Sequence, residues 1–456
     1  MSIEAYLKKH EELKSGAVRK NTQTESIKKV VIKAVKQRIS NDRDISISNF
    51  EDARFKVKQY ALKWIEEELD LRFGPNAVSL EDKYEIYDAL IQNMFGFGAI
   101  EPLLSDPSIT EIMINGTHKI FVEKEGKILE PTDSYGKKLS FADGTELKTI
   151  IDKIVAPINR KVDESNPIVD ARLPDGSRVN VVLNPISLDG TVVTIRRFPE
   201  NPYTMEELIG KGTLDKETAD FLKTLVRAKY NILVSGGTGS GKTTFLNALS
   251  MFIPEKERVI TIEDSAELKF SQVNNLIRME TRPANIEGKG EISIRALVRT
   301  SLRMRPDRIV VGEIRGGEAL DMLQAMNTGH DGSLTTGHSN SAQDMLLRLE
   351  TMVMMAEMDL PLSSIRRQIA SALDIIVHLG RLRDGSRKVI EICEIAGFEQ
   401  GEVMLNTLYK FKETGYDSKT EKIIGHLEKS EDKLTRYEKL FSAGFSDVAK
   451  EWGYGT

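Results

Sequence analysis

The stretch Gly236-Gly-Thr-Gly-Ser-Gly241-Lys242-Thr243 decides the fold of the chain around it. It follows the apolar run NILVS, residues 231–235, and leads into the helical pattern FLNALSMF, residues 245–252. A strand, a glycine-rich loop and a helix in this order are the context of a phosphate-binding loop. Glycines let successive backbone N–H groups surround a phosphate, and the helix N-terminus adds a partial positive charge. The pattern therefore predicts a P-loop.

The residue types of this loop predict its ligands, ATP and Mg²⁺. We expect Lys242 to place its ammonium group on the β- and γ-phosphates and Thr243 to offer its hydroxyl to the Mg²⁺ that bridges them. The expected nucleotide-binding residues are Gly236, Gly237, Thr238, Gly239, Ser240, Gly241, Lys242, Thr243 and Thr244.

The composition of the chain fits a globular protein of about three domains, with 456 residues, 40% hydrophobic and 29% charged. Towards the C-terminus, helical patterns alternate with apolar strands such as RVITIED and RIVVGEI, which is typical of a largely parallel α/β sheet. Upstream, short β-branched runs are separated by Asn-Gly and Asp-Gly, which are hairpin signals. We expect a helical module over 1–77, a smaller mixed α/β domain over 78–198, an interdomain linker over 199–214, and an α/β domain with closing C-terminal helices over 215–456.

Charge and cysteine content exclude several classes of protein. The formal charge of -5 argues weakly against a protein whose main function is to bind nucleic acid. The single Cys393 cannot form an internal disulfide, which fits a reducing cytoplasm. We find no run of about 18 apolar residues, so any membrane role should be peripheral. The segment IKKVVIKAVKQRI, residues 27–39, is a basic amphipathic helix that could lie on a membrane or a partner, or expose its lysines to solvent.

Acidic residues follow two later strands. Glu263, Asp264 and Glu267 come after one apolar strand, and Glu313 comes after another. In a parallel sheet such strand ends lie beside the loop that follows the first strand. We expect Glu313 to polarise the attacking water, with Glu263 as the alternative base. Asp264 or Glu263 could instead hold a metal-bound water, and the sequence leaves these roles open.

Three further patterns carry weaker predictions. His338, in the glycine-rich stretch TGHDGSLTTGHSNS, should act as a sensor that contacts the γ-phosphate or an acidic residue, and not as a metal ligand. The arginines at 295, 299 and 303 repeat every four residues and could form a subunit contact or a solvated face. The methionine-rich segment 349–360 could be a core helix or a flexible partner surface.

Together these motifs resemble those of the secretion ATPases of type II and type IV systems, especially the tight-adherence (Tad/Cpa) pilus branch. The P-loop is followed by an acidic "Asp box" at TIEDSAEL, then by RIVVGEIRGGEA, then by a "His box" at TGHDGSLTTGHSNS. The upstream stretch FGFGAIEPLLSDPSITEIMING is also similar to that family's N-terminal domain.

The resemblance implies a RecA-like ATPase domain behind the smaller α/β domain. It also implies a homo-hexameric ring at the cytoplasmic face of the inner membrane, attached through a platform protein, which uses ATP hydrolysis to drive pilus assembly or secretion. Extension or retraction of a filament is left open. A RecA-like nucleic-acid motor is the alternative, but it would need a basic channel.

The resemblance also assigns roles to residues. Glu313 matches the catalytic acid of the Walker B box, and His338 matches the His-box histidine. Family members bring arginines from the N-terminal domain to the phosphates, and a guanidinium there can neutralise transition-state charge. The matching candidates are Arg172, Arg178, Arg196 and Arg197. Paired surface arginines on strands are the equally open alternative.

Overall fold

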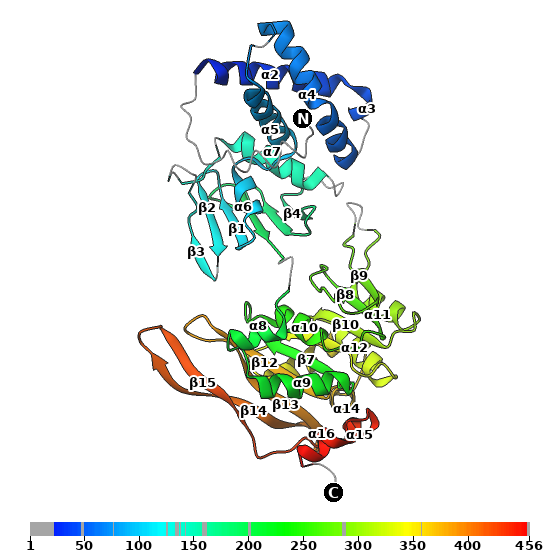
Figure 1. Cartoon of the computed structure of the whole chain (residues 1–456). Coiled ribbons are helices and arrows are strands. Elements are labelled where there is room, and N and C mark those ends of the chain that lie inside the picture. The colour runs from blue at the N-terminus through cyan, green and yellow to red at the C-terminus, as the bar shows by residue number, and fades with distance from the viewer. Residues whose placement is uncertain are drawn as a thin grey trace. The chain divides into compact units, whose positions relative to one another are not determined.

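The computed structural model of this chain forms two compact units, Met1–Arg197 and Phe198–Thr456, which we describe one at a time (Figure 1). The structure describes residues 22–46, 50–75, 77–124, 126–132, 136, 138–141, 143–156, 162–198, 202–284, 289–356 and 358–453.

The first unit contains a helical bundle built from α2 (Thr22–Asn41), α4 (Phe50–Phe73) and α5 (Leu80–Phe95), with the short α3 (Arg43–Ser46) between the first two. Val31 and Val35 of α2 are fully buried in its core. The apolar face of the basic helix is therefore used for packing, and its Arg38 pairs with Glu67 of α4 at 2.6 Å. This arrangement favours the ordinary packed helix over one that lies on a membrane.

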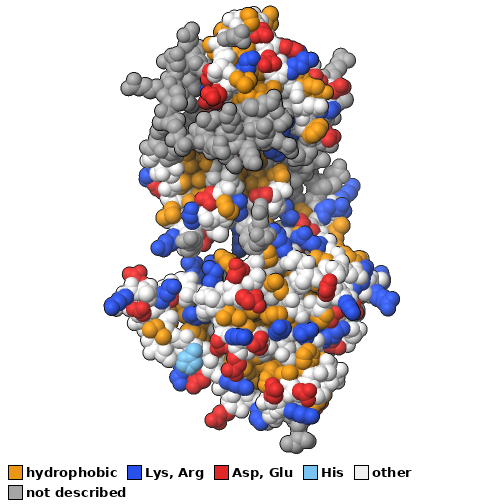
Figure 2. Space-filling model, in the orientation of Figure 1, with side chains coloured by type: hydrophobic (Ala, Val, Ile, Leu, Met, Phe, Trp, Pro, Cys, Tyr) orange, Lys and Arg blue, Asp and Glu red, His pale blue; other side chains and the backbone are white. Residues whose placement is uncertain are grey.

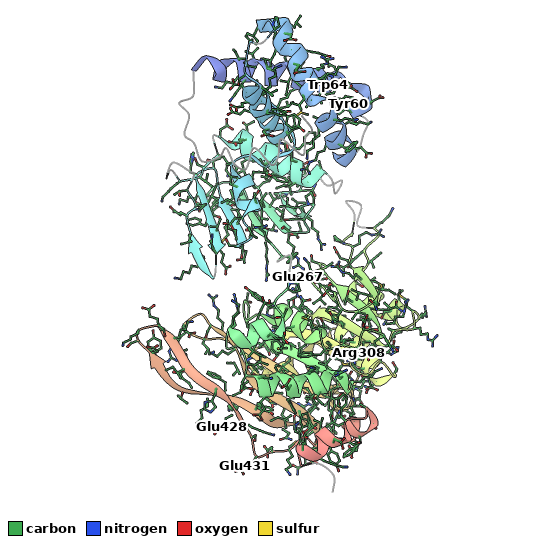
Figure 3. All side chains as sticks on the ribbon, viewed as in Figure 1. Tyr60, Trp64, Glu267, Arg308, Glu428 and Glu431 are labelled. Atoms are coloured by element: carbon green, nitrogen blue, oxygen red, sulfur yellow. The ribbon has the colours of Figure 1, made fainter. Side chains whose placement is uncertain are left out.

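Helix α4 buries one stripe of apolar side chains. Val57, Ala61 and Ile65 are fully buried, whereas Phe55 lies outside the stripe and is 71% exposed. Side chains labelled in Figure 3 show Tyr60 beside Trp64, with ring centroids 5.6 Å apart.

Helix α5 joins the bundle and has the predicted start. Ser79 caps it, since the backbone N–H of Asp82 donates to Ser79 Oγ at 3.1 Å. Its Ile86 and Leu90 are buried against α2 and α4. The domain boundary expected between residues 77 and 78 thus falls inside the bundle.

The rest of the first unit is a six-stranded sheet, counted over the described residues, in the order β3-β2-β1-β6-β5-β4. The strands are β1 (Ile109–Asn115), β2 (Lys119–Lys124), β3 (Lys127–Leu129), β4 (Ile168–Arg172), β5 (Arg178–Val182) and β6 (Val192–Arg196). All pair antiparallel, as the hairpin signals predict. Helix α7 (Gly144–Val155) buries its apolar face in the core of this sheet, which also includes residues of the 3-10 helix η1 (Gly98–Ile100) and α6 (Glu101–Ser105).

The second unit is built on a sheet that has nine strands in the described part of the chain, ordered β15-β14-β13-β12-β7-β11-β10-β8-β9. From β12 to β9 the neighbouring strands are parallel, and β13 to β15 extend the sheet antiparallel. The strands are β7 (Ile232–Gly236), β8 (Arg258–Glu263), β9 (Asn275–Glu280), β10 (Arg308–Ile314), β11 (Leu334–His338), β12 (Ile375–Arg381), β13 (Arg387–Glu399), β14 (Glu402–Asp417) and β15 (Lys422–Lys429).

Helices cover both faces of this sheet. On one face, α8 (Met205–Gly210), α9 (Lys216–Arg227), α10 (Lys242–Ser250), α15 (Glu438–Ser442) and α16 (Ser446–Glu451) share a core with Ile232 and Val234 of β7. On the other, α11 (Ile294–Ser301), α12 (Glu318–Asn327), α13 (Ala342–Met354) and α14 (Leu362–Ala372) share a core with Leu233. The predicted fold class, a P-loop α/β domain preceded by a smaller α/β domain and a helical module, is confirmed.

The second unit also differs from expectation in one place. The segment expected as a linker, 199–214, contains α8, which begins with a capping box between Thr204 and Glu207 and buries Met205 and Leu208. Arg308, the first residue of β10 and labelled in Figure 3, is fully buried and pairs with Glu257. On the face drawn in Figure 2, basic and acidic side chains are interspersed. No helix in the described ranges combines the length and apolar character that crossing a membrane requires.

Candidate nucleotide site

The glycine-rich loop joins β7 to α10, and its glycines are required by its shape. A Cβ atom on Gly236 would lie 2.4 Å from the carbonyl oxygen of Leu379 on β12 and 2.6 Å from Ser240 Oγ. Gly239 and Gly241 have φ of +72° and +91°, a left-handed region that glycine tolerates best. Gly241 is the N-cap of α10 and supplies no side chain to cap it. The helix N-terminus therefore opens into the loop, as a phosphate cradle requires.

Lys242 is buried against the loop that precedes it. Its ammonium group donates to the carbonyl oxygens of Gly236 at 3.0 Å and Gly237 at 2.9 Å, and lies 3.1 Å from His338 Nδ1. This contact arises because β11 pairs with β7 so that His338 lies opposite Gly236.

His338 connects Lys242 to the acid at the end of the next strand. Its Nε2 lies 2.9 Å from Glu313 Oε1. Burial lowers the pKa of His338, although Glu313 opposes that shift. In a neutral ring with its proton on Nε2, Nδ1 accepts from Lys242 and Nε2–H lies close to Glu313, whose Oε1 is buried and has no hydrogen-bond partner.

Arg315, which the sequence reasoning missed, completes this chain of contacts. Its Nη2 lies 2.6 Å from Glu313 Oε2, and its Nη1 lies 3.8 Å from Asp264 Oδ2. The hydrogen bond to Glu313 raises the pKa of Arg315. The only signal in the sequence was its position two residues after Glu313, on the same strand end.

Glu263, the alternative base, has a different environment. Its Oε2 accepts the backbone N–H groups of Glu267 at 2.8 Å and Leu268 at 2.9 Å. Burial raises its pKa to about 7, against the effect of these two hydrogen bonds. Strand β8 is separated from β7 by β11 and β10, whereas Glu313 is separated from it by β11 alone. Glu263 therefore holds the turn after β8, and Glu313 lies in the chain of contacts that reaches Lys242.

The four candidate arginines lie in the first unit, whereas the P-loop lies in the second. Arg172, Arg178 and Arg196 form one cross-strand row over β4, β5 and β6, because Arg178 is paired with both of the others. Arg197 donates to the carbonyl oxygens of Asp106 and Ile109. The three arginines thus share one face of the small sheet, and Arg197 instead contacts the segment that leads into the central strand β1.

A pocket of about 220 Å³ lies beside the loop, within the second unit. Its lining residues are Tyr203, Leu208, Lys211, Thr213, Ser240, Gly241, Thr244, Phe245, Leu379, Gly385, Ser386 and Arg387. Arg387 Nε donates to the carbonyl oxygen of Gly239 at 2.8 Å, which fixes this guanidinium at the pocket wall. Aromatic, aliphatic and hydroxyl groups around one P-loop suit a heterocyclic base and its ribose.

The expected metal ligands are oxygen atoms at the mouth of the site. Thr243 lies in the first turn of α10, half-buried, and Asp264 is exposed at the end of β8. Within the described ranges, His, Cys, Asp and Glu form no group of three that could hold a metal ion. Mg²⁺ fits such a site, because it keeps several waters and takes most remaining ligands from substrate phosphates.

The structure also places the arginine repeat of residues 295–303 and the methionine-rich segment 349–360. Arg295 and Arg299 of α11 both pair with the buried Asp321 of α12, at 2.9 and 2.6 Å, so these two do not form a free basic stripe. In the methionine-rich segment, Met352 is buried in a core, whereas Met354 and Met355 are exposed at the end of α13. The core alternative thus holds for part of the segment, and a partner surface at its exposed end stays a prediction.

Comparison with known proteins places the chain among secretion proteins. Residues 93–422 match the family described as "Type II/IV secretion system protein". A putative conjugal transfer protein of Mycobacterium tuberculosis is 33% identical over 69% of this chain and 88% of its own length. The type IV secretion system protein VirB11 of Bartonella quintana is 33% identical over 64% of this chain and 90% of its own. The crystal structure of the Brucella suis VirB11 ATPase in complex with sulphate is 30% identical, covers 64% of this chain and 92% of that one, and has a TM-score of 0.35.

Proposed function

This chain belongs to the type II/IV secretion system protein family, and on that premise we propose that it hydrolyses ATP to drive pilus assembly or secretion. The observation that carries the proposal is the continuous set of contacts from Lys242 through His338 to Glu313. It links the residue that would hold the phosphates to the acid that would activate water. A site that only bound nucleotide would not need that acid.

In the proposed reaction the base and ribose of ATP enter the pocket beside Arg387, and the phosphates enter the loop. Lys242 moves its ammonium from the loop carbonyls to the β- and γ-phosphates. Thr243 would hold Mg²⁺ directly and Asp264 would hold it through a water, and the ion would neutralise phosphate charge. Glu313 accepts a proton from the attacking water as the bond between the γ-phosphorus and the bridging oxygen breaks. His338 orients Glu313 and senses the γ-phosphate.

The finer parts of the proposal come from family resemblance. They are a homo-hexamer at the cytoplasmic face of the inner membrane, a platform protein as its membrane partner, and membership of the tight-adherence pilus branch. The cross-strand row of Arg172, Arg178 and Arg196 supports a role for the first unit in charge neutralisation, since it concentrates arginines on one face. Arg197 would then support that row. The proposed organisation remains helical module, small α/β domain and RecA-like ATPase domain.

The test is Mg²⁺-dependent release of phosphate from ATP by the purified chain. Lys242→Ala should reduce turnover at least about 100-fold, because the lost cation stabilises charge that develops on the phosphates. Lys223→Ala is the matched control, since this exposed lysine of α9 contacts the Phe252 ring away from the loop. Equal turnover in Lys242→Ala and the wild type would contradict the proposal. Hydrolysis that depends on added DNA would favour a nucleic-acid motor instead.

A further inference from the structure

Arg315 contacts the proposed catalytic acid, Glu313. Its guanidinium contacts one carboxylate oxygen of Glu313, and His338 contacts the other. Of the two oxygens, Oε2 accepts a hydrogen bond from Arg315, whereas the buried Oε1 has no hydrogen-bond partner. The guanidinium takes one acceptor position of Oε2, and its withdrawal would open that position to a water.

The backbone at Arg315 is fixed, whereas its side chain is not. The N–H groups of Arg315 and Gly316 both donate to Glu318 Oε1, at 2.6 and 2.8 Å. A Cβ on Gly317, two residues after Arg315, would lie 2.8 Å from the Cα of Ala356, so the backbone at Gly317 is packed tightly as well. The side chain of Arg315 is 59% exposed, against 19% for Glu313. The guanidinium of Arg315 can therefore move through solvent while the backbone that carries it stays in place.

An exchange of partners would cost little at this exposure. An ion pair with a solvated partner contributes little to stability, because water replaces most of the attraction. A γ-phosphate carries more negative charge than a carboxylate and accepts bidentate hydrogen bonds from arginine. Asp264, near Nη1 of Arg315, marks the side of the site where we expect the metal.

We propose that Arg315 exchanges Glu313 for the γ-phosphate when ATP binds, and so acts as a phosphate-binding arginine supplied by the same chain. The exchange frees Glu313 Oε2 for the attacking water. The water oxygen then bonds to the γ-phosphorus, ADP leaves with the bridging oxygen, and the water proton passes to Glu313. This inference rests on the proposed function, which it extends from the acid to the group that controls it.

Binding measurements separate this inference from the proposed function. Arg315→Ala should weaken binding of a non-hydrolysable ATP analogue with Mg²⁺ by about tenfold, because a charge-assisted contact to the γ-phosphate is lost. ADP lacks that phosphate, so its Kd should change by less than about twofold. Arg315→Lys should recover part of the difference, since it keeps the charge but not the planar fork. Phosphate release should fall by about 10²–10³-fold in Arg315→Ala.

Arg72→Ala is the matched control. Arg72 pairs with Glu68 at 2.8 Å, with side-chain exposures of 45% and 14%, in a helix of the first unit. It should change neither nucleotide affinity nor turnover. Equal weakening of both nucleotides by Arg315→Ala, or of neither, would overturn the inference. Failure of the wild type to hydrolyse ATP would overturn the proposed function, while the ratio of the two affinities would still decide the role of Arg315.

Discussion

Two charged clusters lie at opposite ends of the central strands β7 and β12. At the loop end, Glu313 is held by His338 and Arg315, both partly exposed. At the other end, Asp374 is 1% exposed and accepts from the backbone N–H of Asn231 at 2.8 Å, Arg436 Nη1 at 2.8 Å and Lys439 Nζ at 2.6 Å.

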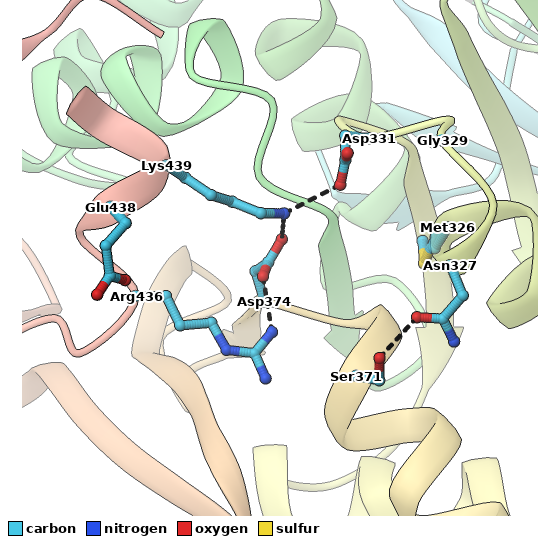
Figure 4. A pocket seen from close by; sticks show the side chains of 9 residues that line it. All are labelled: Met326, Asn327, Gly329, Asp331, Ser371, Asp374, Arg436, Glu438 and Lys439. Carbon is cyan, nitrogen blue, oxygen red and sulfur yellow. Dashed lines mark hydrogen bonds and ion pairs between the residues drawn. The ribbon is translucent and has the colours of Figure 1, made fainter. Parts of the chain in front are cut away.

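The partners of Asp374 are themselves held in place. Arg436 also donates to the carbonyl oxygen of Leu373 at 3.2 Å, and Lys439 reaches Asp331 at 3.1 Å. These contacts line a pocket of about 360 Å³ where the C-terminal segment meets the sheet (Figure 4). The same residue types thus form a fixed ion-pair cluster around the buried Asp374, and a cluster around Glu313 whose partners reach solvent and can exchange.

The largest expected effect is on catalysis, at the loop end. Glu313→Gln should lower phosphate release by about 10²–10⁴-fold, because an amide cannot accept the water proton. Affinity for ATP and the unfolding temperature should stay close to the wild type, since the carboxylate is not a buried anchor. Steady-state kinetics, nucleotide binding and thermal unfolding measure these three quantities. Undiminished hydrolysis would transfer the role of base to Glu263.

At the end of the sheet opposite the P-loop, a substitution of Asp374 should reduce stability and leave turnover nearly unchanged. Asp374→Ala should lower the free energy of unfolding by about 3–5 kcal/mol, because two cations and a backbone N–H lose a buried acceptor. Denaturant unfolding measures this loss. Turnover per folded molecule at low temperature should be close to normal. A stable but inactive Asp374→Ala protein would show that the two clusters are not independent.

Glu263 offers an intermediate case, a buried carboxyl near the loop end. Its pKa in the folded chain is about 7, above the ordinary value, so the folded state binds its proton more tightly than the unfolded state does. The stability that this group contributes is present at low pH and is lost as pH rises towards and through 7. Between pH 5 and pH 8 the wild type should lose stability relative to Glu263→Gln, whose amide oxygen still accepts both N–H groups. Parallel unfolding curves at the two pH values would contradict this assignment.

The smallest effect should come from removing one partner of Asp374. Lys439→Ala leaves Arg436 and the Asn231 N–H on Asp374, so we expect a loss of about 1 kcal/mol in unfolding free energy. Denaturant unfolding beside Asp374→Ala gives the comparison. A loss as large as that of Asp374→Ala would mean that Lys439 alone holds Asp374.

The parallel core of the second unit could be predicted from the sequence for a physical reason. Buried parallel strands read as continuous apolar runs, so NILVS, RVITIED and RIVVGEI each indicate a strand, and β7, β8 and β10 lie there. The glycine pattern adds the loop, and the position of acids after strands brings Glu313 and His338 near it.

What the sequence did not indicate depends on packing between distant segments. Helix α8 lies where a linker was expected, although Thr204 and Glu207 have the spacing of a capping box. Helix α5 follows Gly74-Pro75, which resembles a boundary, but only the buried Ile86 and Leu90 show that it belongs to the bundle. Arg315 is an exposed side chain without a motif of its own, so only coordinates reveal its contact with Glu313.

The strands that flank the P-loop are made long after the loop itself, which affects how the protein folds during translation. Gly236 lies against the carbonyl of Leu379, and β7 is flanked by β11 and β12, which follow it by roughly 100 and 140 residues. At about 5–20 residues per second, a ribosome needs on the order of ten seconds to add the second of these strands. β7 lacks both neighbours until β11 is made and lacks β12 for the whole interval, so its apolar side chains are open to chaperones. The nucleotide loop is therefore completed late in translation, and a chain released before Leu379 lacks the strand against which that loop is shaped.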